Sequence, residues 1–327
     1  MENKIKESKY LLPLSIVIAG AMLALAWMYN TRLRVVGVSQ NISVVSEEIS
    51  KTELEEKVLP TEGAVLPATW GDLGKKLVSV GAIDGEKFKT LYKQREQFTE
   101  EYEKLLFSNN NGKIKINEEN AGYLLNLFWA LGLASDNPIL SDKTEIANPT
   151  YSRSGAIASG FASTGGWTMA VGNPMNHYSR HKFFDLTPEQ QVMVEKVSRG
   201  IYRPCCNNST HFPDCNHGMA MLGLLELLAS QGVSEQDMWK TALAVNSYWF
   251  PDTYITIATY MKEKKGVEWS DVNPQEMLGV NYSSASGYQR IASQVTTPSN
   301  PRSGNGCSVE TSQSTLTQPR QQSGCGI

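Results

Sequence analysis

Apolar side chains at helical spacing dominate the central part of the chain. Within residues 88–106 the apolar and aromatic residues recur every three or four positions, as on one face of a helix. Asn117 precedes the strongly apolar stretch AGYLLNLFWALGLAS and can cap a second helix. Strand signals are weak throughout, so the pattern predicts an all-α fold.

Further helices in the second half of the chain carry start and stop signals. Thr187, with Pro188 and Gln190 after it, has the pattern of a capping box with a proline in the first turn. The other predicted starts are Asn216, Ser234 and Asp252, and the predicted stops are Gly232 and Pro251.

The N-terminal part contains a candidate membrane helix. From Leu11 to Met28 the stretch LLPLSIVIAGAMLALAWM has no charged residue, and it is long enough to cross a hydrocarbon core of about 30 Å. Lysines precede it, which favours a cytoplasmic N-terminus and an extracytoplasmic remainder. A cleaved signal peptide ending near Ala26 is the alternative. The predicted location is the cell membrane, with a single span in contact with the lipid bilayer.

Composition divides the chain into four parts. Residues 1–34 form the anchor with its flanks, and the polar and β-branched residues 35–60 form a stalk. Residues 61–294 form a helical ectodomain. Residues 295–327 have almost no apolar side chains and are predicted to be a disordered tail, which contains Cys307 and Cys325.

Charge and motifs exclude several functions. The formal net charge of −3 and the lack of basic clusters give no support for nucleic-acid binding. The glycines of residues 149–174 match neither a phosphate loop nor a dinucleotide fingerprint, so no nucleotide motif is present. No C-x-x-C occurs, which excludes heme attachment through C-x-x-C-H and a thioredoxin motif. These absences favour a binding protein over an enzyme.

Metal-ligand residue types concentrate between Arg203 and Met221, in RPCCNNSTHFPDCNHGMAM. Cysteine, histidine and methionine are ligands for soft or borderline ions such as Cu(I) and Zn(II). We expect Cys215 to lie at a helix N-terminus, where backbone N–H groups favour its thiolate. The predicted ligands are Cys205, Cys206, Cys215, His217 and His211.

Secondary candidates lie on either side of these five. His177 and His181 have the spacing of one helix face and lie close to Met175, although both histidines could be ordinary surface residues. Met219 and Met221 fall in an apolar helix, where core packing is the alternative to metal ligation.

The five cysteines permit two other functions. In thiol–disulfide exchange, Cys206 or Cys215 would react with a partner, and Cys307 or Cys325 of the tail would resolve the mixed disulfide. In a structural surface protein, Cys205 and Cys215 would form a disulfide. The adjacent Cys205 and Cys206 favour a metal or redox role, because a disulfide between neighbouring residues is strained.

The stretch GIYRPCCNNSTHFPDCNHGMAMLGLLELLASQGVSEQDMW resembles a family of exported bacterial proteins without an assigned function. It is distantly similar to PCYCGC-motif surface proteins, although the YCG spacing is missing here. RPCCNNS is more faintly similar to the thiol subunit of bacterial cytochrome c maturation, but it lacks that family's gap between the cysteines. The positions that match the PCYCGC pattern are Pro204, Cys205, Cys206, His211, Asp214 and Cys215.

Overall fold

The computed structural model describes residues 21–29, 52–148 and 158–295, in two compact units. In the first unit, Met1–Glu53, residues 21–29 form a helix with exposed side chains. Among the described residues, no helix has both the length and the apolar character that a membrane span requires. Residues 11–20 of the predicted span lie outside the described part, so the membrane span stays a prediction. The predicted tail lies outside it as well, except for residue 295.

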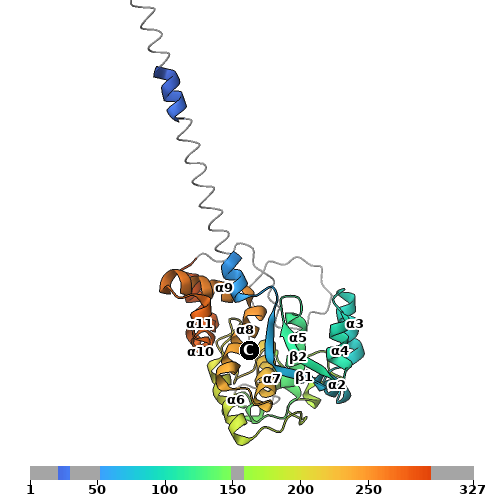
Figure 1. The fold of residues 1–327 in the computed structure, drawn as a ribbon. Helices are drawn as coiled ribbons and strands as arrows, with labels where there is room; N and C mark the ends of the chain where they lie inside the picture. Colours follow the sequence, from blue (N-terminus) through green and yellow to red (C-terminus); the bar gives the residue numbers. More distant parts are fainter. Residues whose placement is uncertain (1–20, 30–51, 149–157, 296–327) are drawn as a thin grey trace, which may run out of the picture. The chain divides into compact units, whose positions relative to one another are not determined.

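The second unit, Leu54–Ile327, is mostly helical, which confirms the predicted helical class in its coarse form (Figure 1). Residues 52–58 form a helix just before the two strands, and a π-helical turn extends α9. The strands are β1 (Ala64–Gly71) and β2 (Asn111–Ile116), and the α-helices are α2 (Leu73–Ser79), α3 (Gly85–Gln94), α4 (Glu100–Phe107), α5 (Ala121–Ala134), α6 (Pro188–Gly200), α7 (Asn216–Ser230), α8 (Glu235–Trp249), α9 (Pro251–Tyr260), α10 (Pro274–Leu278), α11 (Val280–Ser283) and α12 (Ala285–Ala292).

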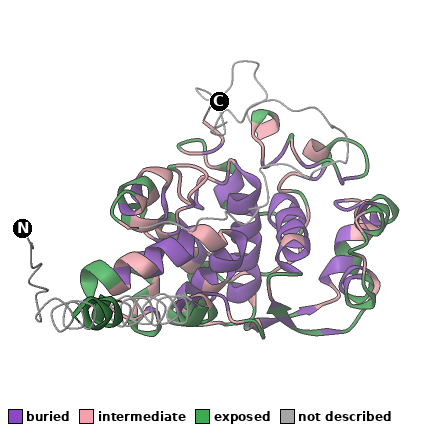
Figure 2. Ribbon diagram, turned by 90° about the horizontal axis from the view of Figure 1, so that it is seen from above, coloured by how far each residue is buried: buried purple, intermediate pink, exposed green. Residues whose placement is uncertain are grey.

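Helices α5 and α7 form the centre of the core and are buried along almost their whole length (Figure 2). Both are apolar on all sides, as expected for helices with no face toward water. They approach closely at Gly132 and Gly223. A Cβ added to Gly132 would lie 2.0 Å from the carbonyl oxygen of Met219, and one added to Gly223 would lie 2.6 Å from the backbone nitrogen of Gly132. Only glycine permits this backbone contact.

The two-stranded sheet corrects the all-α prediction. β1 and β2 pair antiparallel, from Ala64 opposite Ile116 to Gly71 opposite Asn111. Along β1, alternate side chains enter the core, among them Leu66 and Trp70. The sequence therefore has the period of two that a half-buried strand requires. Pro67 interrupts the apolar pattern, and a proline within a strand argues for an edge position, which β1 occupies in a two-stranded sheet.

The globular unit begins before the predicted end of the stalk at residue 60. Leu54, Val58 and Leu59 are buried members of the main hydrophobic cluster. Lys57 donates a hydrogen bond of 2.8 Å to Glu268, far along the chain. The end of the polar 35–60 stretch therefore packs on the core, while residues 35–51 lie outside the described part.

Several predicted helix starts are confirmed, and others shift. Thr187 caps α6 with the complete capping box, and the hydroxyl of Ser234 caps α8. α7 is capped by Cys215 and not by Asn216, because the sulfur accepts the N–H of Gly218. Other boundaries differ by a few residues, since α5 begins at Ala121 after an asparagine turn, α9 begins at Pro251 and not at Asp252, and the 88–106 pattern is divided between α3 and α4.

Replacing Gly132 with alanine should destabilise the protein although alanine is the better helix former. The alanine preference is worth about 1 kcal/mol, whereas overpacking a core contact costs about 1–3 kcal/mol, and here the clash is with backbone that cannot rotate away. We expect a net loss of about 2 kcal/mol in the free energy of unfolding, measured by denaturant titration. Gly160→Ala is the control, because its Cβ would meet no atom within 4 Å. Equal stability of the two variants would contradict the close helix contact.

Glu226 should make stability depend on pH. It is 1% exposed on α7, and burial raises its pKa from 4.5 to about 8, against hydrogen bonds to Ser135 and Asn137 that lower it. A raised carboxyl pKa means that the folded state holds the proton more tightly. Its contribution is therefore complete below pH 4.5 and is lost as the pH rises toward about 8.

Glu226→Gln should remove this pH dependence. Relative to the variant, we expect wild-type stability to fall by roughly 3–5 kcal/mol between those two pH values. Denaturant titrations across that range measure it, with Glu263→Gln, at an exposed position, as the control. Parallel profiles for wild type and Glu226→Gln would show that the carboxyl does not titrate there.

Candidate metal centre

The predicted ligands lie in the loop between α6 and α7 and in the first turn of α7. Tyr202 and Ser209 form an isolated antiparallel bridge, and the N–H of Thr210 donates to the carbonyl of Ile201. Inside this closure, the N–H of Cys206 donates to the carbonyl of Arg203 in a tight turn. The carbonyl of Cys206 accepts the N–H of Ala285 at 2.9 Å, which ties the turn to α12. The backbone therefore fixes the position of both adjacent cysteines.

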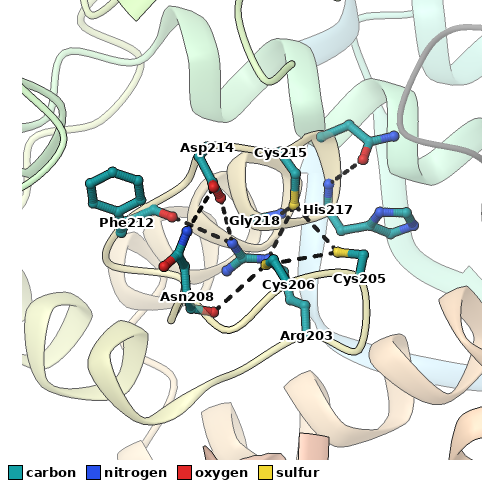
Figure 3. A network of polar contacts seen from close by, with 10 residues as sticks. Arg203, Cys205, Cys206, Asn208, Phe212, Asp214, Cys215, His217 and Gly218 are labelled. Carbon is teal, nitrogen blue, oxygen red and sulfur yellow. Dashed lines mark hydrogen bonds and ion pairs between the residues drawn. The ribbon is translucent and has the colours of Figure 1, made fainter. Parts of the chain in front are cut away.

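A fully buried arginine organises the loop (Figure 3). Arg203 donates through Nε to the sulfur of Cys215 at 3.2 Å and through Nη2 to Oδ1 of Asp214 at 3.0 Å. The other carboxylate oxygen of Asp214 accepts a hydrogen bond of 2.7 Å from Asn208. A Cβ added to Gly218 would lie 2.7 Å from the guanidinium carbon, so the first turn of α7 must carry glycine at this position.

Three sulfur atoms converge beside this guanidinium group. The sulfur of Cys205 lies 3.7 Å from that of Cys215 and 3.9 Å from that of Cys206. A disulfide bond is about 2.05 Å long, so no disulfide joins these three sulfurs to one another. Figure 3 shows the sulfurs turned toward one another. The loop thus assembles the three cysteines that the sequence singled out.

Cys215 is the cysteine whose surroundings favour the thiolate form. Hydrogen bonds from the thiols of Cys205 and Cys206 hold its pKa well below the usual range, and the charge of Arg203 adds to this, against the effect of burial. The N–H of Gly218 donates to the same sulfur at 3.4 Å, as at a helix N-terminus. The pKa of Cys206 is raised by the same thiol hydrogen bonds and by burial. The loop therefore places a thiol with a lowered pKa beside the buried positive charge of Arg203.

His217 adds nitrogen ligands to the sulfur cluster. Its ring is 1% exposed and packs on Phe250 with centroids 4.3 Å apart. Among the described residues, neither ring nitrogen has a partner at normal hydrogen-bond geometry, although the interaction with His217 contributes to the lowered pKa of Cys215. One ligand atom each from Cys205, Cys215 and His217 lie within 4.8 Å of one another, and the same holds for Cys206, Asp214 and Cys215. These two overlapping groups can hold a metal ion.

The other predicted ligands lie outside these two groups. His211 is buried and its N–H donates to the carbonyl of Ser198, but it belongs to neither ligand group. Met219 and Met221 are fully buried in the hydrophobic core, as the alternative of core packing predicted. Cys307 and Cys325 lie outside the described residues.

His177 and His181 bond to each other. The Nδ1 of His177 lies 3.2 Å from the Nε2 of His181, and neither histidine belongs to the groups around Cys215. The segment is not the helix that their spacing predicted. Pro174–Asn176 forms a single 3-10 turn, and Met175 is engaged through its backbone N–H with Asn173.

Sequence reasoning missed the residues that neutralise and orient the cluster, namely Arg203, Asp214 and Asn208. A signal for the first two is present in the sequence. Between residues 201 and 225 they are the only charged side chains, in a window that leads into an apolar helix. Isolated opposite charges in such a window suit a buried ion pair.

Comparison with known proteins adds no relative. No protein-family model, curated protein sequence or solved structure matches this chain.

The thiolate character of Cys215 should be visible in the metal-free, reduced protein. We expect ultraviolet thiolate absorbance at neutral pH that is lost in Cys215→Ser, because Arg203 and two thiols stabilise the anion. Cys206→Ser, which keeps a hydroxyl donor, should retain the signal. A wild-type signal that emerges only at the alkaline pH of an ordinary thiol would contradict the assignment.

Proposed function

We propose that this protein binds one soft or borderline metal ion, Zn(II) or Cu(I), through Cys205, Cys206, Cys215 and His217. The cluster offers three sulfurs and one imidazole, a donor set typical of Cys₃His zinc sites. The protein would use it for metal capture or delivery.

The spacing of the sulfur atoms carries the proposal. In a tetrahedral zinc site with Zn–S bonds of about 2.3 Å, neighbouring sulfurs are about 3.8 Å apart. The separations of 3.7 Å and 3.9 Å around Cys205 agree with this value. An ion could therefore enter with little movement of the cysteines.

Charge favours Zn(II) over Cu(I) when all three cysteines are ligands. Three thiolates leave one net negative charge on Zn(II) and two on Cu(I), and buried charge is unfavourable unless it is compensated. Arg203 is the nearby cation, and it is already paired with Asp214. Cu(I) would suit a state in which one of the cysteines stays protonated.

His217 is a better fourth ligand than Asp214. Both carboxylate oxygens of Asp214 already accept hydrogen bonds, from Arg203 and Asn208. The ring of His217 interacts with the thiol of Cys215, but its nitrogens make no hydrogen bond of normal geometry to the described residues, and leaving a buried polar atom without one costs about 1–3 kcal/mol. A metal bond to one ring nitrogen would offset part of this cost.

Thiol–disulfide exchange is less well supported. The cysteine with the lowered pKa, Cys215, is 0% exposed, so a partner disulfide has no access to it. The more exposed Cys206 has a raised pKa, which makes it a poor nucleophile. The structural alternative required a disulfide between Cys205 and Cys215, whereas their sulfurs lie 3.7 Å apart, well beyond the length of such a bond.

The proposed setting is extracytoplasmic, with the protein held at the cell membrane by residues 11–28. The uncharged stretch and the lysines before it support this part of the proposal. In such a setting the ion would enter past Cys205 and Cys206, which are half-buried. The buried side of the site would be formed by Cys215 and His217.

Metal content tests the proposal. The full-length chain, purified without a histidine tag and with its thiols reduced, should bind Zn(II) at this site, as measured by elemental analysis and competition with a chromophoric chelator. Cys206→Ser and His217→Gln should each weaken that binding. Loss of a direct ligand should exceed the roughly 10–100-fold effect typical of an outer partner.

His211→Gln is the matched control, because His211 lies in the same loop and belongs to neither ligand group. It should bind zinc at the cysteine site like the wild type. Cysteine variants that leave metal content unchanged while trapping mixed disulfides would favour the exchange function instead. Reduced wild-type protein that takes up neither Zn(II) nor Cu(I) at this site would falsify the proposal.

A further inference from the structure

We propose that His177 and His181 form a second metal site, for a borderline divalent ion such as Zn(II), independent of the cysteine centre. The site would use one nitrogen from each ring, with water at the remaining positions. It does not depend on the cysteine centre being a metal site.

The distance between the two nitrogens fits a shared ion. With Zn–N bonds of about 2.0–2.1 Å in tetrahedral geometry, two nitrogen ligands are about 3.3–3.4 Å apart. The Nδ1 of His177 and the Nε2 of His181 are separated by 3.2 Å. Without a metal, the two atoms can share only one proton, so at least one of the facing nitrogens carries a lone pair in the neutral rings.

The other nitrogen of His177 fixes which atom is the ligand. Its Nε2 lies 3.1 Å from the carbonyl oxygen of Val171. A carbonyl only accepts, so Nε2 carries the hydrogen and Nδ1 presents its lone pair toward His181. Histidines that bind metals usually donate their second N–H to such a group, which orients the ring and makes the ligand more basic.

The backbone holds both rings in place without a helix. Ser179, between the two histidines, has a φ of 50°, in the left-handed region. The N–H of His181 donates to the carbonyl of Ala134 at 2.8 Å, and its carbonyl accepts the N–H of Asp136. A strained residue held by surrounding hydrogen bonds is frequent at functional sites.

The charge state suits a metal ligand. Burial, His177 and Arg180 lower the pKa of His181, which favours the uncharged form of its ring. His177 is 8% exposed, while His181 is partly exposed, so the open coordination positions would face solvent. Two protein ligands and solvent access predict weaker and more exchangeable binding than at the cysteine centre.

Zinc titration of the reduced full-length chain tests this site. We expect wild-type protein to bind a weaker equivalent in addition to any tight one, and His181→Gln and His177→Gln each to lose the weaker equivalent. Cys206→Ser should keep it, which separates failure of this site from failure of the cysteine centre. His211→Gln is again the control.

A second readout covers any unfolding of the variants. Zinc should raise the melting temperature of Cys206→Ser, and adding His181→Gln should abolish that rise while circular dichroism stays unchanged. If the histidines only bond to each other, their variants will melt lower but bind as much zinc as wild type. That result, or a wild type with no weaker equivalent, overturns the proposal.

Discussion

The backbone contact between α5 and α7 is the constraint on which the rest of the fold depends. Gly132 and Gly223 bring the two helices together so closely that no side chain fits between them. Both helices are buried along almost their whole length, and α2, α6, α8 and β1 pack directly against one or both of them. Because α7 begins with Cys215 as its cap, the same contact determines where the thiolate and the ring of His217 lie.

Burial of Arg203 then selects the charge state of the loop. A cation with 0% exposure is unfavourable unless anions accompany it. Asp214 supplies one anion, and the sulfur of Cys215 faces Nε. The arginine therefore favours thiolate over thiol, and thiolate is the form that binds metal. The charged groups around Arg203 therefore affect both the stability of the fold and the capacity of the cysteines to bind metal.

Features that depend on neighbouring residues in the sequence could be predicted, whereas features that depend on contacts between distant segments could not. Capping residues located α6 and α8, and the cysteine spacing located the site. Pro67 interrupts the strand pattern of β1, and the partner strand lies some forty residues further along the chain, so the sequence did not predict this strand. The sequence could not rank His211 against His217 as a ligand. The difference arises from packing, since the ring of His217 lies against Phe250 and beside the sulfurs of Cys205 and Cys215, whereas His211 belongs to neither ligand group.

One helix positions both candidate centres. Near its C-terminal end, α5 contacts α7 through Gly132, and two residues later the carbonyl of Ala134 accepts the N–H of His181. The two sets of ligands nevertheless differ in burial, since His217 and Cys215 are enclosed whereas His181 is partly exposed. An enclosed sulfur site favours retention of a soft ion, and an open imidazole pair favours rapid exchange with solvent. Under the two proposals, α5 would support one enclosed site and one site open to solvent, and this difference in burial would set how readily each ion exchanges.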